Sequence, residues 1–246
     1  MNFFFHFGRY LVMLKQAFAR PQNFSMYWRE TMRQMNDIGV GSLIIVCIIA
    51  TFIGGVAAIQ FAYQLSGNMI PSYYIGYIVR DLSIIEMSPT ITCLVLAGKV
   101  GSNMTAEIGG MRQKEHIDAM EIMGVNTASY LIFPKVIAAI LMIPMLVSLA
   151  AFVSMVGGYL ASVPQGLISD GDYIRGLRSF FVPYNVVMMY VKATVFAFLL
   201  TTVSCYQGYY VQGGSIELGQ ASTRGVVYSD ICILLADFVI ALILTS

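Results

Sequence analysis

The chain has 246 residues, of which 58% are hydrophobic and 11% charged, and its mean hydropathy is +0.74. Soluble domains carry about a quarter charged residues, so this composition excludes an ordinary soluble protein and predicts an integral membrane protein. The formal net charge is +1, which argues against nucleic acid or another polyanion as a partner. The four cysteines and two histidines have neither metal nor redox spacing, so no metal site is predicted.

Residues 1–37 are predicted to form two amphipathic helices that lie along the membrane surface. Aromatic residues are mixed with Arg or Lys in both pieces, and Pro21 separates the first piece from Ser25–Asp37. Aromatic and basic side chains together favour the headgroup layer over the hydrocarbon. We therefore expect the membrane-spanning part to begin at residue 38.

Five apolar runs follow, and each is long enough to cross the roughly 20-residue thickness of the hydrocarbon. They are Ile38–Tyr63, Ile84–Met104, Val136–Ala161, Tyr184–Tyr206 and Gly225–Leu244. A segment that crosses lipid alone satisfies its own backbone only as a helix. The predicted fold is therefore an all-α integral membrane protein, with interfacial helices over residues 1–37 and a five-span domain over residues 38–246.

Polar segments separate these spans. Gln64–Ser83 and Val163–Pro183 each predict a short helix, and Asp170 is the expected N-cap of the second one. The glycine-rich segment Gln207–Gln220 is expected to be a loop.

Charges crowd together in one place, between the second and third spans. Six ionisable residues stand there within ten positions: Arg112, Lys114, Glu115, His116, Asp118 and Glu121. Ile117 and Met120 recur at helical spacing on another face, which predicts an amphipathic helix. Such a helix cannot lie in hydrocarbon, so it must be at one membrane face. A solvated connecting helix and a docking helix for a cytoplasmic motor both fit this pattern.

The placement of Lys and Arg predicts the orientation of the chain. One side holds ten of them: Arg9, Lys15, Arg20, Arg29, Arg33, Lys99, Arg112, Lys114, Lys135 and Arg224. The other side holds three: Arg80, Arg175 and Arg178. We therefore expect a cytoplasmic N-terminus, a cytoplasmic charged stretch and a C-terminus on the opposite side.

Charged side chains inside predicted spans include Glu86, Lys192 and Asp237. Each costs at least about 2.5–3.5 kcal/mol near the bilayer centre, so each needs a partner or water. Two interpretations stay open. Lys192 forms a neutral pair with Glu86 or Asp237 inside the bundle, or the three groups mark a polar spot in a substrate path.

Catalytic chemistry is not indicated. The chain has no G-x-x-x-x-G-K-[ST] motif, so it is not expected to hydrolyse nucleotide itself. No nucleophile stands with a matching base, so no catalytic residue is predicted and the chain is expected not to be an enzyme.

Several runs in the second span and beyond match a known pattern. They are Glu86-Met87-Ser88-Pro89, Leu96-Ala97-Gly98-Lys99-Val100-Gly101-Ser102, Thr105-Ala106-Glu107-Ile108-Gly109, His116 to Val125, and Ala221 to Val227. From Arg33 onward the chain resembles the MlaE/YrbE family of ABC permeases. The resemblance implies a homodimer in the bacterial inner membrane that moves phospholipids between the inner and outer membranes. It also implies two copies of a cytoplasmic ABC ATPase (MlaF-like) and a ring of MCE-domain protein (MlaD-like) on the outer side. ATP and Mg would bind the ATPase, and no cofactor is expected on this chain.

The resemblance also implies site residues. A coupling helix at about residues 105–124 would seat in the ATPase, through Arg112, Glu115, Ile117, Asp118, Met120, Glu121 and Gly124. The lipid would occupy an outward-open cavity between the two permeases, lined by the first, second and fifth spans. By motif position Gln60, Glu86 and Met87 would line it, and the apolar Phe52 and Val56 of the first span suit acyl chains. Lys192 and Asp237 match polar positions of the family.

One departure concerns the start of the second span. The family often has Arg-Glu-Leu-Gly-Pro there, whereas this chain has Ile85-Glu86-Met87-Ser88-Pro89. Glu86 therefore lacks its neighbouring cation, and Arg80, about one and a half turns away, is the candidate substitute.

Two other functions are compatible with the residues. An ion- or proton-coupled carrier could use Glu86, Lys192 and Asp237 as a relay, but it leaves the charged helix unexplained. A scaffold that anchors partners through that helix leaves the intramembrane charges unexplained.

Overall fold

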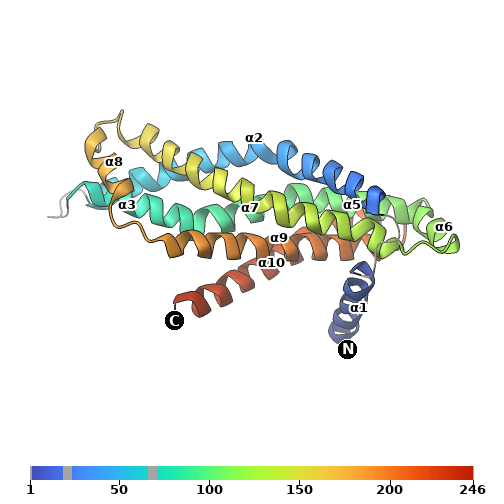
Figure 1. Ribbon diagram of the computed structural model, residues 1–246. Helices are drawn as coiled ribbons and strands as arrows, with labels where there is room; N and C mark the ends of the chain where they lie inside the picture. Colours follow the sequence, from blue (N-terminus) through green and yellow to red (C-terminus); the bar gives the residue numbers. More distant parts are fainter. Residues whose placement is uncertain (1, 19–23, 66–70, 246) are drawn as a thin grey trace.

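The computed structural model describes residues 2–18, 24–65 and 71–245, and every regular element in these ranges is a helix (Figure 1). In chain order the elements are α1 (Asn2–Ala17), α2 (Phe24–Leu65), α3 (Tyr73–Leu82), η1 (Ser83–Ile91), α4 (Thr92–Leu96), η2 (Ala97–Gly101), α5 (Ser102–Gln113), α6 (His116–Ile122), α7 (Thr127–Ser162), α8 (Asp170–Arg178), α9 (Pro183–Tyr209) and α10 (Ser215–Thr245). The two η elements are π-helical.

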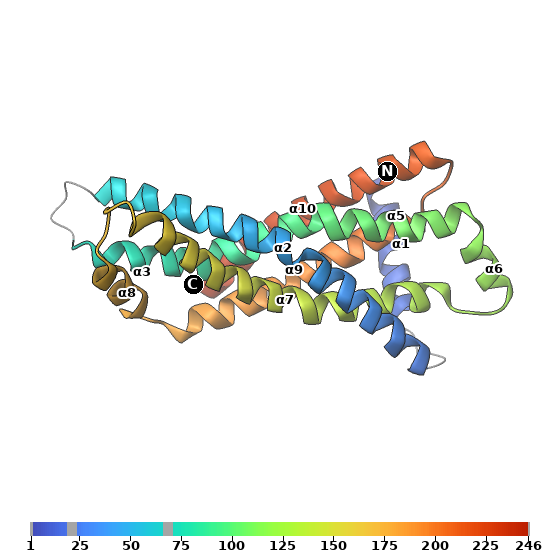
Figure 2. The same cartoon turned by 90° about the horizontal axis from the view of Figure 1, so that it is seen from above.

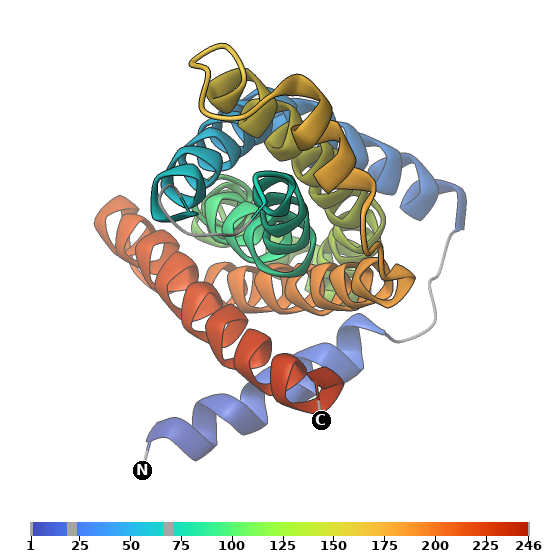
Figure 3. The ribbon, with the colours of Figure 1, turned by 90° about the vertical axis from the view of Figure 1, so that its left-hand side faces the viewer.

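Five helices are long and apolar enough to cross a membrane, which confirms the predicted number of spans. They are α2, the unbroken run from α3 to α5, α7, α9 and α10. Figures 1 and 2 show α2, the second span, α7 and α9 running lengthwise, with α6 at one end of the bundle and α3 and α8 at the other. We call these the α6 end and the α8 end. Figure 3, seen from the α8 end, shows α10 crossing the outside of the bundle.

The predicted second interfacial helix is not a separate element. Residues 24–65 form one helix of 42 residues, without a break at Asp37. At 1.5 Å per residue this helix is roughly 60 Å long, twice the thickness of the hydrocarbon, so part of it must project beyond the membrane. The first predicted piece is a helix of its own, α1. Pro21, the expected break between the two pieces, lies outside the described residues.

Helix α2 packs lengthwise against α7 through contacts between backbones. A Cβ on Gly54 would collide with the carbonyl of Ser154, and a Cβ on Gly157 would collide with the backbone of Thr51. Small residues at such crossings let transmembrane helices approach closely and gain van der Waals contact. The side of α2 that carries Gly54 is therefore a packing surface.

The second span is longer than predicted, because α3 continues into it without a break. Pro89 lies inside η1 and has no backbone N–H to donate. The π-helical register of η1 tolerates this gap, and a second π-helical turn follows at η2. The helix then runs through α5 to Gln113.

The predicted coupling helix over residues 105–124 is likewise not one helix. Residues 105–113 belong to the end of the second span, and α6 covers only His116–Ile122. The chain turns between them at Lys114 and Glu115, and Glu115 adopts a left-handed conformation with φ of 59°. The single helix that the resemblance implied is therefore divided by a turn at Lys114 and Glu115.

At the α8 end, α3 crosses α8 at Gly76 and Gly176, where a Cβ on Gly76 would lie 2.6 Å from the carbonyl oxygen of Tyr173. Tyr173 is fully buried, and its hydroxyl donates to the carbonyl of Met155. This burial raises the pKa of Tyr173 to about 12. The N-cap of α8 is Ser169, which accepts from the backbone N–H of Asp172, so the predicted cap at Asp170 is wrong by one residue.

Candidate functional site

The three intramembrane charges meet in one cluster, which we call the triad. Lys192 of α9 places its Nζ 2.9 Å from Glu86 Oε1 of η1 and 2.7 Å from Asp237 Oδ1 of α10. The predicted pairing of Lys192 with one carboxylate or the other is therefore realised with both. Three spans that are far apart in sequence are joined by one ammonium group.

The triad is unevenly shielded. The Lys192 side chain is fully buried and Asp237 is 15% exposed, whereas Glu86 is 43% exposed. Thr90 donates to Asp237 Oδ2 at 3.0 Å, while Asp237 Oδ1 has the ion pair but no aligned hydrogen bond. With all groups ionised the cluster carries a net charge of −1, and removing Lys192 would leave two carboxylates facing each other in a low dielectric.

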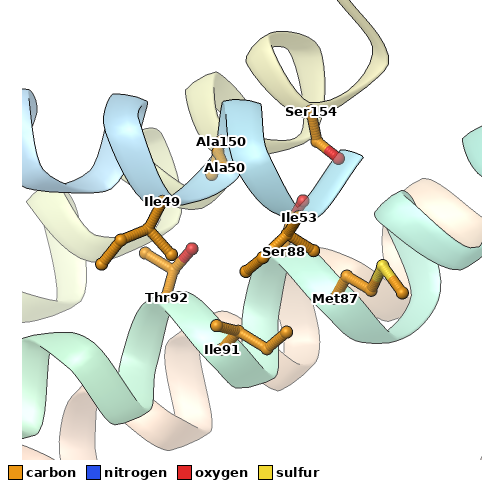
Figure 4. Close-up of a pocket in the computed structure, with 9 residues that line it drawn as sticks. All are labelled: Ile49, Ala50, Ile53, Met87, Ser88, Ile91, Thr92, Ala150 and Ser154. Atoms are coloured by element: carbon orange, nitrogen blue, oxygen red, sulfur yellow. The ribbon is translucent and has the colours of Figure 1, made fainter. Parts of the chain in front are cut away.

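Two hollows lie near Glu86. Figure 4 shows the first, where α2, η1, α4 and α7 meet; its lining includes Ile53, Met87 and Ser154. Its cavity volume is about 10 Å³, room for about one water molecule. The second is an open groove of about 200 Å³ along α3 and η1, lined by Tyr77, Ile78, Asp81, Leu82, Ile85 and Glu86. Pockets for drug-sized ligands measure about 300–1,000 Å³, so neither hollow encloses a phospholipid.

The loop at the α6 end is braced from inside. Arg112 Nη1 lies 2.8 Å from Asp118 Oδ1, across the turn between α5 and α6. Glu121 Oε1 accepts from the hydroxyls of Thr127 and Tyr209, at 3.1 and 3.0 Å. These contacts fasten α6 to both α7 and α9, so a force on α6 would be transmitted into the bundle.

The sequence matches the family described as Permease MlaE over residues 31–243, which is most of the chain. The chain belongs to the MlaE permease family. Together with its five apolar helices, this makes it a multi-pass membrane permease.

Named relatives cover nearly the whole permease. A protein of Rickettsia bellii (strain RML369-C) named probable ABC transporter permease protein is 33% identical over 244 residues, 95% of this chain and 94% of the relative. The Haemophilus influenzae protein named intermembrane phospholipid transport system permease protein MlaE is 29% identical over 245 residues, 99% of this chain and 94% of the relative. The Arabidopsis thaliana protein TRIGALACTOSYLDIACYLGLYCEROL 1, chloroplastic, is 31% identical over 235 residues, 94% of this chain and 65% of the relative.

The permease does not gather its predicted lipid-binding residues around one cavity. Phe52 and Val56 are 71% and 53% exposed on α2, Gln60 is also exposed, and none of them lines either hollow. Met87 lines the small hollow and Glu86 lines the open groove. Within one copy of the chain, the apolar and polar parts of the predicted site stay separate.

Arg80 cannot replace the missing family arginine. Its guanidinium is buried and donates to the carbonyls of Leu177, Ser179 and Phe180 at 2.7–3.1 Å. Two further hydrogen bonds go to Asp81, at 2.7 and 2.9 Å. The carbonyls belong to the end of α8 and the residues after it, where a helix leaves acceptors unsatisfied and favours a cation. Arg80 therefore has no donor left for a phosphate.

The predicted coupling residues of the permease divide into two groups. Ile117 is fully buried and Met120 packs against the core, while Arg112, Asp118 and Glu121 are occupied by the contacts described above. Glu115 and Gly124 are exposed at the ends of α6.

Sequence reasoning missed the most exposed apolar residues of this loop. Ile122 and Met123 are 88% and 71% exposed. They follow directly after the inward-facing residues and come just before Gly124, whose φ of 78° ends the helix. The sequence did contain a signal for this exposed pair: two apolar residues stand at the end of a charged helix, next to a glycine. Asp230 of the fifth span and the ion pair of Lys135 with Glu107 were also overlooked.

Proposed function

We propose that this chain is the permease subunit of an ABC transporter that moves phospholipids between the inner and outer membranes. The observation that carries the proposal is the α6 loop, which is braced on its inner side and presents bare apolar side chains on its outer side. Exposed apolar residues on a firmly held loop are typical of a protein interface. Family membership directs the choice of partner toward an ATPase.

The partner at the α6 end would be a cytoplasmic ABC ATPase (MlaF-like), which holds ATP and Mg. Ile122 and Met123 would enter a groove on its surface, with Glu115 and Gly124 at the rim. Ile117 and Met120 would then pass the movement to the core that they contact. This chain itself would bind no cofactor.

The transport cavity would be shared between two copies of the chain. One copy offers a groove of about 200 Å³ beside Glu86, too small for a lipid, and leaves Phe52 and Val56 uncovered. In a homodimer the first, second and fifth spans of both copies would enclose an outward-open cavity, with Met87 among its apolar residues and Gln60 and Glu86 among its polar ones. Closure of the ATPases would narrow the cavity and expel the lipid toward an MCE-domain ring (MlaD-like).

The proposed orientation follows from the placement of Lys and Arg. The α6 end and the N-terminus would face the cytoplasm, and the α8 end and the C-terminus the periplasm, in a bacterial inner membrane. The α8 end would then face the MCE ring, and the groove beside Glu86, which begins in α3, would open toward the same side.

A second candidate function rests on the triad. An ion- or proton-coupled carrier needs ionisable groups that exchange partners inside the membrane, and Glu86, Lys192 and Asp237 are in contact. Such a carrier would work in proteoliposomes without an ATPase. The α6 loop would then be dispensable.

The α6 loop provides the test. Ile122→Glu and Met123→Glu are compared with Lys114→Glu, which places the same charge at an exposed position of the same loop. The permease is purified from its own membranes in mild detergent, its bound proteins and lipids are identified by native mass spectrometry, and ATP-driven lipid transfer is measured in proteoliposomes.

We expect the unaltered chain to carry an ATPase, an MCE protein and phospholipid. We also expect the two tip variants to lose the ATPase and at least 10-fold of the transfer rate, while Lys114→Glu keeps both. Full transfer activity in a chain that carries no ATPase would contradict the proposal and favour the carrier.

A further inference from the structure

Two oppositely charged side chains, one on the second span and one on the fifth, have no ion pair within the described part of the chain. Lys99 of η2 donates a hydrogen bond to the carbonyl of Gly41 but contacts no carboxylate. Asp230 of α10 has a buried Oδ1 without any hydrogen-bond partner among the described residues. The ammonium groups of Lys135 and Lys192 do have carboxylate partners. Among the charged residues of the five predicted spans, Lys99 and Asp230 are therefore the ones without an ion pair in the described part of the chain.

The two groups lie at similar depth. A Cβ on Gly101 would be 2.7 Å from Ser204 Oγ, and Ser204 Oγ lies 3.4 Å from Ser229 Oγ. The contact of Gly101, Ser204 and Ser229 marks one level along the bundle. Lys99 precedes Gly101 by two residues and Asp230 follows Ser229 by one, so a helix rise of about 3 Å or less separates each charged residue from that level. They nevertheless do not meet in one chain, because Lys99 reaches toward α2 and Asp230 lies on α10.

The surface between these charges is suited to close contact with another helix. Small residues repeat every fourth position along η2 and α5, at Gly98, Ser102, Ala106 and Gly110. A Cβ on Gly98 or Gly110 would meet no atom within 4 Å, so this stripe is open. A stripe of small residues lets a second transmembrane helix approach closely.

The neighbouring helix α10 is equally uncovered. Only 11% of its most apolar 18-residue stretch is buried, against 39–50% of the matching stretches in the other four spans. Its ionisable Asp230 would be costly next to lipid alone, because a charge at membrane depth needs a compensating partner. The chemistry that this face lacks, an ammonium group at the same depth, is what a second copy of the chain carries.

We propose that a second copy packs on the face made by η2, α5 and α10, and that Lys99 of each copy pairs with Asp230 of the other. A two-fold axis along the membrane normal keeps both groups at their depth and forms the pair twice. The inference rests on the proposed homodimer and names its interface. It gives the inner half of the dimer a fixed contact, around which the outer half could open and close.

The test uses charge exchange between two chains. The Lys99→Asp chain has acids at both positions, and the Asp230→Lys chain has bases at both, so each homodimer would oppose like charges. When the two chains are co-expressed with different tags, the heterodimer regains two opposite pairs. A pair within one chain could never be rescued by mixing.

We expect the unaltered chain to be dimeric by native mass spectrometry. Each variant alone should lose at least 10-fold of its dimer, and the mixed sample should recover the dimer with one tag of each kind. Recovery also shows that both variants fold. If the unaltered chain is dimeric and the mixture does not recover, or if each variant alone stays dimeric, the ion pair is overturned while the dimer stands. A monomeric unaltered chain overturns the dimer itself.

A second measurement is independent of charge. Lys99→Cys and Asp230→Cys are placed on differently tagged chains that lack the four native cysteines. The two chains are treated with a short bismaleimide, because an ion pair between Lys99 and Asp230 holds the two backbones farther apart than a disulfide does. The expected product is a covalent heterodimer on a denaturing gel. Phe152→Cys, at an exposed position of α7, replaces Asp230→Cys as the matched control and should give none. A cross-link between Lys99→Cys and Asp230→Cys no stronger than the control would contradict the proposed interface.

Discussion

Two buried cations of this permease have opposite surroundings. Arg80 at the α8 end donates five hydrogen bonds, three to carbonyls and two to the carboxylate of the adjacent residue. Lys192 contacts two carboxylates from two other spans, and one of these, Glu86, is 43% exposed. All donors of the Arg80 guanidinium are used by backbone carbonyls and by the neighbouring Asp81 carboxylate, so Arg80 fastens α3 to the segment after α8. Lys192 is held by charge from separate helices, so its contacts depend on where those helices lie.

The difference distinguishes a structural charge from one that can take part in movement. A guanidinium whose donors are all used has no reason to change partners. An ammonium group between two carboxylates can lose one and keep the other, and the partly exposed Glu86 is the carboxylate that water or a headgroup reaches more easily. Four predictions test this comparison.

The largest effect is expected for Lys192→Met, which leaves Glu86 and Asp237 facing each other without a cation. Breaking a buried ion pair on one side costs about 3–5 kcal/mol, so the thermal midpoint of the purified protein should fall sharply. Lipid transfer per folded molecule should also be lost. Lys192→Arg keeps the charge and serves as the control. Normal transfer by folded Lys192→Met would show that the triad is only structural.

The next largest effect is expected for Arg80→Met. It removes five hydrogen bonds and leaves the carbonyls after α8 without donors, each worth about 1–3 kcal/mol if it stays buried and unpaired. We expect a lower thermal midpoint and faster proteolysis at the α8 end, but unchanged transfer per folded molecule. A transfer defect in the folded variant, measured at a temperature well below its midpoint, would remove the proposed distinction between Arg80 and Lys192.

The two carboxylates of the triad should differ. Asp237→Asn removes the negative charge from the better shielded carboxylate, which also accepts a hydrogen bond from Thr90. Glu86→Gln removes the negative charge from the carboxylate that solvent reaches. We expect Asp237→Asn to lower the thermal midpoint more and Glu86→Gln to lower the transfer rate more. The two variants are matched in chemistry, so equal changes in both measurements would contradict an asymmetric triad.

The smallest effect is expected for Thr90→Val, which keeps the shape and removes one hydrogen bond to Asp237 Oδ2. A single hydrogen bond to a charged group contributes roughly 1.5–3 kcal/mol at most, and a neutral one about 1 kcal/mol. The thermal midpoint should fall by a few degrees without loss of transfer. Thr194→Val provides the comparison, since Thr194 bonds only to the carbonyl of Tyr190 in its own helix.

The positions of the spans were readable from the sequence, while their exact limits were not. Hydropathy predicted all five, because crossing lipid demands about 20 apolar residues in a row. The predicted limits were wrong where a helix continues beyond its apolar run. Residues 24–37 extend α2, and Tyr73–Leu82 extends the second span, because polarity ends a span without ending a helix.

The candidate site was predicted in part. Lys192, Glu86 and Asp237 were identified because charge is rare in a membrane, but their meeting depends on the rotation of three helices. The exposed pair Ile122 and Met123 was missed, because the turn at Glu115 changes the direction of α6.

What the sequence determined by itself was the all-helical membrane class, the five spans, the charged loop and the family pattern. Each of these depends on runs of neighbouring residues and on the demands that a bilayer makes of any chain. Only the tertiary structure decided that one lysine serves two carboxylates, that Arg80 is already saturated, and that Lys99 and Asp230 have no ion-pair partner among the described residues of one copy. Those outcomes depend on contacts between residues tens to more than a hundred positions apart, which helix packing sets and local composition does not encode.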